Sequence, residues 1–223
     1  MAAVKGDPTR RSALLRSGFS RLKYQIQDWT SLLVAVTASA MVLWGLGPSE
    51  ILIDSTPTGG DMGAHVWGPA FLRDELLRSF RLRGWSLGWY AGVPAMHFDC
   101  VRSHLFIVFV DLFAPYGVAF KLVAVSGVVL MPMAAWLMGR ISRWREPLPA
   151  LLAVAALLFV FDFNFTIYGG NIASTLAGEF AFSRGLAVSL VYLGFTNRVL
   201  EAGTHKVRAS IALALVALCH PIT

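Results

Sequence analysis

The sequence predicts an all-α membrane protein: a polytopic bundle of transmembrane helices with a long external first loop. Of its 223 residues, 56% are apolar and 14% are charged, whereas soluble domains average about 45–50% and about 25%. Long apolar runs alternate with short clusters of arginine and lysine. Because these basic residues form no continuous stripe, the net charge of +6 indicates membrane topology and not nucleic-acid binding. Membrane lipids are therefore expected partners, and nucleic acid is not.

Four apolar segments are predicted to cross the membrane, which takes about 17–25 residues for a helix. They are 31–46, 119–138, 148–166 and 185–196, the last extended slightly at both ends. A fifth apolar segment begins near Ala209 and reaches Thr223 without completing a span. We therefore expect a transmembrane region over residues 31–223, with about four complete spans and the start of a fifth, in a chain that continues further.

Clusters of basic residues set the expected orientation. They lie in the N-terminal segment 1–30 and in two short loops, near 140–145 and 198–208. Lysine and arginine favour cytoplasmic loops, so we expect a cytoplasmic N-terminal segment in a cell-membrane protein. The loops at 47–117 and 167–183 are then extracytoplasmic. The apolar run 104–115 would reverse this orientation if it crossed the membrane, and it is interpreted as re-entrant or surface-lying.

The long first loop is predicted to contain an amphipathic helix from Met62 to about Ser79, lying at the membrane surface. Its apolar residues recur at spacings typical of a helix: Ala64, Trp67, Phe71, Leu72, Leu76 and Phe80. Pro69 either kinks this helix or starts a second one at its first position. Asp74 and Glu75 lie on the polar face, where solvated charge pairs are expected.

Asp61 stands between a Gly59-Gly60 turn and the start of this helix. Backbone N–H groups and the helix dipole favour an ionised carboxylate at such a position. His65 follows four residues later, on the same face of the helix. The pair fits three roles: capping of the helix by Asp61, a shared proton, or a shared divalent metal.

A glycine-spaced aromatic stretch at 84–94 contains Trp85, Trp89 and Tyr90. Tryptophan and tyrosine often form a belt at the membrane interface. Their rings also serve as stacking platforms for a sugar ring or an isoprenoid tail. Further on, Arg102 offers a fork of donors that suits a lipid phosphate, with an ordinary interfacial arginine as the alternative.

The second predicted external loop carries Glu179 and Arg184 just before a span. These two residues either form a structural ion pair or contact an acceptor hydroxyl and a donor phosphate. Asp111, Asp162 and His220 lie within or beside apolar runs. Ionisable groups at such positions are functional candidates, although each also fits a helix cap or interfacial water.

Several of these features together resemble a known group of proteins. They are a first span, a glycine-flanked aspartate soon after it, an amphipathic juxtamembrane helix, and a Gly-Trp…Gly-Trp-Tyr-x-Gly-x-Pro stretch before the second span. This arrangement over about residues 30–185 resembles the N-terminal part of GT-C glycosyltransferases. It is also similar to related large envelope proteins, including those described as a membrane domain related to 6-pyruvoyl-tetrahydropterin synthase.

The resemblance implies transfer of a sugar from a polyprenyl-phosphate-linked donor to a cell-envelope glycan or lipid at the external face. Asp61 takes the role of catalytic base, with Asp54 as its substitute. The residues expected to bind substrate are His65, Trp85, Trp89, Tyr90, Arg102, Glu179 and Arg184. The chain lacks the Asp-x-Asp pair of metal-using members, so no cofactor is implied. The alternative is a non-enzymatic envelope protein or transporter that binds lipid or glycan through the same loop.

Overall fold

The computed structural model describes residues 28–88, 91–97 and 101–220. This part of the chain is mostly helical, as predicted. It contains three helices that are long and apolar enough to cross a membrane: Asp28–Gly45, Tyr116–Ile141 and Ile172–Ala202. These helices indicate a membrane protein. Most of the predicted N-terminal segment 1–30 lies outside the described residues.

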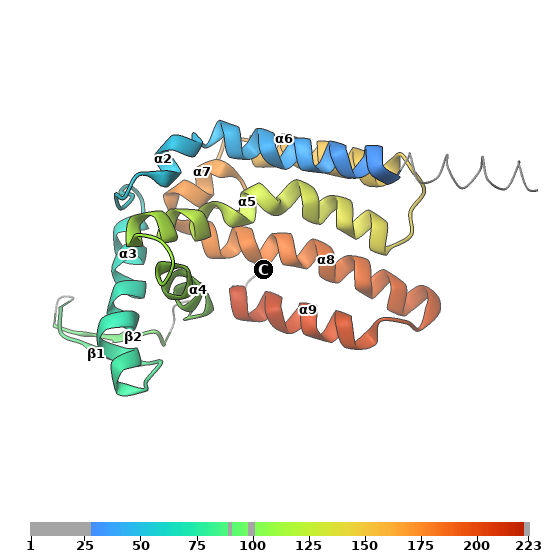
Figure 1. Ribbon diagram of the computed structural model, residues 1–223. Coiled ribbons are helices and arrows are strands. Elements are labelled where there is room, and N and C mark those ends of the chain that lie inside the picture. Colours follow the sequence, from blue (N-terminus) through green and yellow to red (C-terminus); the bar gives the residue numbers. More distant parts are fainter. Residues whose placement is uncertain (1–27, 89–90, 98–100, 221–223) are drawn as a thin grey trace, which may run out of the picture.

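Helix α5 (Tyr116–Ile141) is the centre of the helical assembly and packs along both α6 (Leu148–Val160) and α8 (Phe180–Ala202) (Figure 1). Helix α9 (Lys206–Cys219) packs on the other side of α8. Gly127 allows close approach, because a Cβ atom there would lie 2.5 Å from the backbone nitrogen of Arg184. Small residues that let helix backbones approach closely are typical of membrane helix contacts.

Helix α6 is shorter than the predicted span at 148–166, and that prediction is wrong. It has 13 residues, or about 20 Å of helix, whereas the hydrocarbon core is about 30 Å thick. Beyond it the chain forms a loop in which the Asp162 carboxylate accepts hydrogen bonds from the Asn164 N–H at 2.9 Å and the Tyr168 hydroxyl at 2.6 Å. Three helices, and not four, reach spanning length in the described part.

Residues 62–79, predicted as one helix, are helical throughout. They form α3 (Met62–Phe71), a π-helical turn η1 (Leu72–Leu76) and a 3₁₀ turn η2 (Leu77–Ser79). Pro69 lies inside α3, and π geometry begins three residues later, at Leu72. Proline lacks the N–H that a regular helix uses, and the Leu72 N–H resumes the backbone hydrogen bonding with Gly68 and Pro69 as acceptors.

The apolar run 104–115 forms most of α4 (Val101–Asp111). Its 11 residues extend about 17 Å, so α4 is too short to cross the hydrocarbon core. The next helix, α5, begins after a turn at Pro115. This length agrees with the interpretation of the run as re-entrant or surface-lying.

A small antiparallel sheet is the part of the long loop that the all-α prediction missed. Strand β1 (Gly84–Ser86) pairs with β2 (Val93–Ala95), with Trp85 opposite Pro94. Gly92 has a φ of +110°, and a Cβ atom there would lie 2.2 Å from Nε1 of Trp85. Glycine at position 92 therefore lets the chain before β2 approach the Trp85 ring closely.

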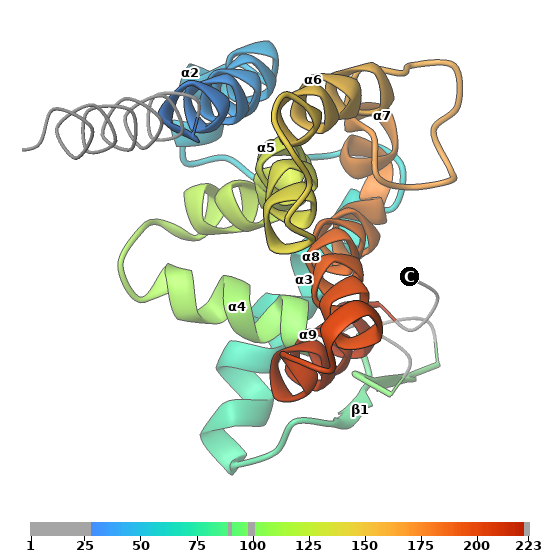
Figure 2. The ribbon, with the colours of Figure 1, turned by 90° about the vertical axis from the view of Figure 1, so that its right-hand side faces the viewer.

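The elements of the two predicted external loops gather at one end of the long helices. Helix α2 (Pro48–Leu52), α3, α4, the two strands and α7 (Ile172–Ser174) lie at this end. Figure 2 shows the long helices nearly end-on. The basic loop between α5 and α6 and the loop between α8 and α9 lie at the opposite end.

Candidate functional site

Asp61 lies where the two predicted external loops meet. Its backbone N–H donates a hydrogen bond of 2.8 Å to the carbonyl oxygen of Ala177, which lies in the π-helical turn η3 (Thr175–Glu179). Gly178 packs against it, since a Cβ atom on Gly178 would lie 3.0 Å from Cβ of Asp61 and 3.4 Å from Cδ2 of His65. Residues more than one hundred positions apart are thus brought into direct contact.

The Asp61 carboxylate is not used as a helix cap. Its side chain is exposed and makes no cap hydrogen bond to α3, so the capping alternative does not apply. The backbone carbonyl of Asp61 accepts the His65 N–H at 3.1 Å and continues the helix. The carboxylate therefore remains open at the surface, next to the N-terminus of α3.

His65 and His104 share a small cavity between α3, α4 and the sheet. The cavity has a volume of about 140 Å³ and is lined by Ala64, His65, Trp67, Gly68, Val93, Ala95 and His104. The two imidazole centroids are 6.5 Å apart, and His104 is buried. Gly68 gives His104 its space, because a Cβ atom at this glycine would lie 2.9 Å from Nε2 of His104.

Phe180 connects His65 to Arg184. The ring of His65 meets the ring of Phe180 edge-on at 5.1 Å, and the Arg184 guanidinium lies over the Phe180 ring at 5.3 Å from its centroid. Glu179 is half-buried beside them. No ion pair joins Glu179 to Arg184 among the described contacts, so the structural ion pair considered from the sequence is absent here.

Hydrogen bonds around Asn171 hold η3 in position against Asp61. The fully buried Asn171 accepts the Ser174 N–H at 2.8 Å and so caps α7. Its amide group donates to the carbonyl oxygens of Asp162 and Phe165, at 2.6 and 3.0 Å. The Asn171 side chain thereby connects the loop after α6 to helix α7, which directly precedes η3.

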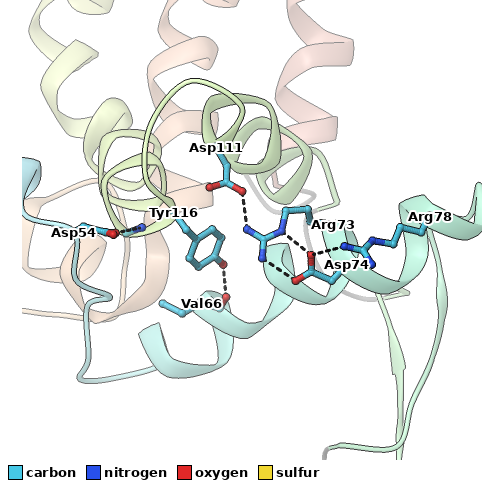
Figure 3. Close-up of polar contacts among 8 residues, drawn as sticks. Asp54, Val66, Arg73, Asp74, Arg78, Asp111 and Tyr116 are labelled. Atoms are coloured by element: carbon cyan, nitrogen blue, oxygen red, sulfur yellow. Dashed lines mark hydrogen bonds and ion pairs between the residues drawn. The ribbon is translucent and has the colours of Figure 1, made fainter.

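Asp54 contacts α5, whereas Asp61 contacts η3. Oδ1 of Asp54 accepts the backbone N–H of Gly117 at 3.1 Å, in the first turn of α5 (Figure 3). Lys121 fixes the same stretch of chain by donating to the carbonyl oxygens of Glu50 and Ile53, each at 2.6 Å. Asp54 thus stabilises the start of α5, as an acceptor for an otherwise unpaired N–H group.

The remaining predicted binding residues are scattered. Trp85 on β1 is exposed, and Arg102 donates from Nη1 to the carbonyl oxygen of Leu215 at 2.5 Å, which joins α4 to α9. Trp89 and Tyr90 lie outside the described residues. Asp61, His65, Glu179 and Arg184 are thus the predicted residues that the structure brings together.

A second polar cluster, drawn in Figure 3, was missed as a unit. Arg73 donates from Nη1 to Asp111 at 2.7 Å, and from Nε and Nη2 to the two oxygens of Asp74 at 2.8 and 2.7 Å. It also lies over the ring of Tyr116, whose hydroxyl donates to the carbonyl oxygen of Val66. Hydrogen bonds from Arg73 hold the pKa of Asp74 below its usual value. The signal in the sequence was a carboxylate, Asp111, at the end of an apolar run.

Among the described residues, no group of three histidine, cysteine or acidic side chains is arranged to hold a metal ion. Comparison with protein-family models, with curated proteins and with solved structures gives no match. Conclusions about function therefore depend on the residues and geometry of the site itself.

Proposed function

We propose that this chain forms part of a multi-pass membrane glycosyltransferase. In this proposal its long helices cross the cell membrane as a bundle, with a cytoplasmic N-terminus and α3 at the external surface. The enzyme transfers a sugar from a polyprenyl-phosphate-linked donor to a cell-envelope glycan or lipid. The strongest support is the exposed carboxylate of Asp61, which is not used as a helix cap. The hydrogen bond from the Asp61 N–H to the Ala177 carbonyl oxygen fixes this residue where the two loops meet.

Asp61 acts as the general base in the proposed reaction. It takes the proton of an acceptor hydroxyl while the hydroxyl oxygen bonds to the anomeric carbon of the donor. The bond between that carbon and the phosphate oxygen breaks, and the polyprenyl phosphate leaves with the electron pair. The configuration at the anomeric carbon is inverted. A positioned base contributes about 10²–10⁴ in rate, and the open carboxylate of Asp61 suits this role.

Arg184 is the cation best suited to the leaving phosphate. Both Arg184 and His65 contact the ring of Phe180, which directly follows the turn η3 that contacts Asp61. Positive charge in a site shielded from water stabilises an oxyanion more strongly than it does in water. Arg102 is the second candidate; its Nη1 donates to the carbonyl oxygen of Leu215 on α9 and so directs the guanidinium toward that helix. Strand β2 lines the same cavity as His65, and its partner β1 carries Trp85, a surface on which a sugar ring can stack.

Turnover by the Asp61→Asn variant tests the proposal. The full chain is reconstituted in vesicles with a radiolabelled polyprenyl-phosphate sugar and a membrane extract as the source of acceptor. Asparagine keeps the size of the side chain but removes the base, so transfer should fall by about a hundredfold or more. Asp54→Asn is the matched control and should remain near wild type, because an amide oxygen still accepts the Gly117 N–H.

Three outcomes decide between the alternatives. Full activity in Asp61→Asn would remove the base assignment. Loss of activity in both Asp61→Asn and His65→Ala, together with sensitivity to a chelator, would favour a shared divalent ion. Donor binding without any transfer by the wild-type protein would favour the non-enzymatic binding or transport alternative.

A further inference from the structure

An apolar groove lies between α5, α8 and α9, on a different part of the molecule from Asp61. Its volume is about 460 Å³. Helix α8 lies between the other two helices and packs along each of them (Figures 1 and 2). The groove is lined by apolar side chains from all three helices and by a single charged residue, Arg208.

Small residues create this groove. Ala134, Ala187 and Ala212 form its floor and are 5–7% exposed. Larger residues form its rim, and Leu130 and Ile211 are 54% and 56% exposed. Leu130 lies on α5, a helix of membrane-spanning length, where exposed apolar side chains face lipid tails. The groove is therefore open to the acyl chains of the bilayer.

Arg208 lies at the end of the groove that is formed by the C-terminal part of α5 and the N-terminus of α9. It is in the first turn of α9, near Leu137 at the end of α5 and Phe195 in the second half of α8. From Arg208 to Leu215, the groove follows α9 for about 10 Å. A ligand with a charged head and an apolar tail would match this order of charge followed by apolar surface.

Charge at this end of the molecule is unbalanced. The described residues there include six basic side chains, Arg140, Arg143, Arg145, Arg198, Lys206 and Arg208, and three acidic ones, Asp28, Glu146 and Glu201. Arg140 pairs with both Asp28 and Glu146, and Arg198 pairs with Glu201. Within the described part of the chain, Arg208 forms no ion pair, and no carboxylate there is left unpaired to neutralise it.

We propose that this groove binds an acyl chain of an anionic phospholipid whose phosphate contacts Arg208. Basic pockets between membrane helices are suited to anionic headgroups, and the arginine fork suits phosphate oxygens. A second copy of this chain or another apolar helix would fill the groove but would not neutralise Arg208. A zwitterionic lipid would supply the tail without the net charge. This site does not depend on the proposed transfer reaction.

Photo-crosslinking of the full chain tests the site. The protein is placed in phosphatidylcholine vesicles that contain a trace of phosphatidylglycerol with a photoreactive acyl chain, or of the matched phosphatidylcholine analogue. Crosslinks should map to α9 and to the facing turns of α5. The phosphatidylglycerol analogue should react about fivefold more, since one basic residue near the surface favours an anionic lipid by about this factor.

Three variants separate the contribution of the charge from that of the groove. Arg208→Gln should reduce labelling by phosphatidylglycerol to the level of phosphatidylcholine, whereas Arg145→Gln, which removes the same charge at the same end, should not. Val191→Phe narrows the groove and should reduce labelling by both analogues, with thermal unfolding as the check on folding. Equal labelling by the two lipids, equal effects of Arg208→Gln and Arg145→Gln, or chain-to-chain crosslinks at the groove would each overturn the proposal.

Discussion

Gly60 determines at the residue scale whether the two loops can meet. It has a φ of +49°, a region that side chains other than glycine rarely adopt. A Cβ atom at this position would lie 2.2 Å from the carbonyl oxygen of Ala177, the acceptor of the Asp61 N–H. Both the backbone conformation and the close approach therefore require glycine.

We predict that Gly60→Ala destabilises the protein by about 1–3 kcal/mol and separates Asp61 from η3. Thermal unfolding in detergent measures the first effect, and donor turnover measures the second. Gly63→Ala is the matched control: no atom lies within 4 Å of its added Cβ, and alanine favours a helix over glycine. A Gly60→Ala protein as stable and active as Gly63→Ala would contradict the account of this junction.

At the scale of elements, the Arg73 cluster holds the helix 62–79 against the corner between α4 and α5. Asp111 ends α4 and Tyr116 begins α5, and both contact residues of this helix. The Asp111 side chain is only 12% exposed. Removing one partner of a largely buried ion pair is costly, because the other charge is left without compensation.

We predict that Asp111→Asn loosens this attachment without unfolding the long helices. Amide hydrogen exchange should become faster over residues 62–79, while exchange in α5 and α8 stays close to wild type. Asp28→Asn is the control, since Asp28 pairs with Arg140 at the opposite end of the molecule and should leave residues 62–79 unchanged. Unaltered exchange over 62–79 in Asp111→Asn would show that the cluster does not fix the helix.

The helices were predictable because apolar runs and helical spacing are local properties of the sequence. The end of α6 could not be predicted in this way, because Phe161 and Phe163 continue the apolar run. The helix ends there because Asp162 accepts hydrogen bonds from residues of the following loop. The hairpin was not predicted, because the stretch 84–94 was interpreted as an aromatic surface and its glycines were not considered as turn residues. For the site, Asp61 and His65 could be paired from their spacing, whereas the close approach of Gly178 depends on packing across more than one hundred residues.

At the scale of the whole molecule, the two ends of the long helices differ in content. One end carries the Asp61 junction, the histidine cavity and the Arg73 cluster, and the other carries the excess of basic side chains around Arg208. In a membrane protein this asymmetry predicts a cytoplasmic basic end and an external Asp61 junction. The proposed reaction requires that arrangement, because the lipid-linked donor is expected at the external face.

Cysteine labelling in intact cells tests this arrangement most directly. The two native cysteines, Cys100 and Cys219, are replaced first, and single cysteines are then introduced in the full chain at the exposed positions Thr58 and Arg145. A membrane-impermeant maleimide should label Thr58→Cys in intact cells, and should label Arg145→Cys only after the membrane is opened. Labelling of Arg145→Cys in intact cells, with Thr58→Cys protected until lysis, would place the Asp61 junction in the cytoplasm and contradict the proposed external site.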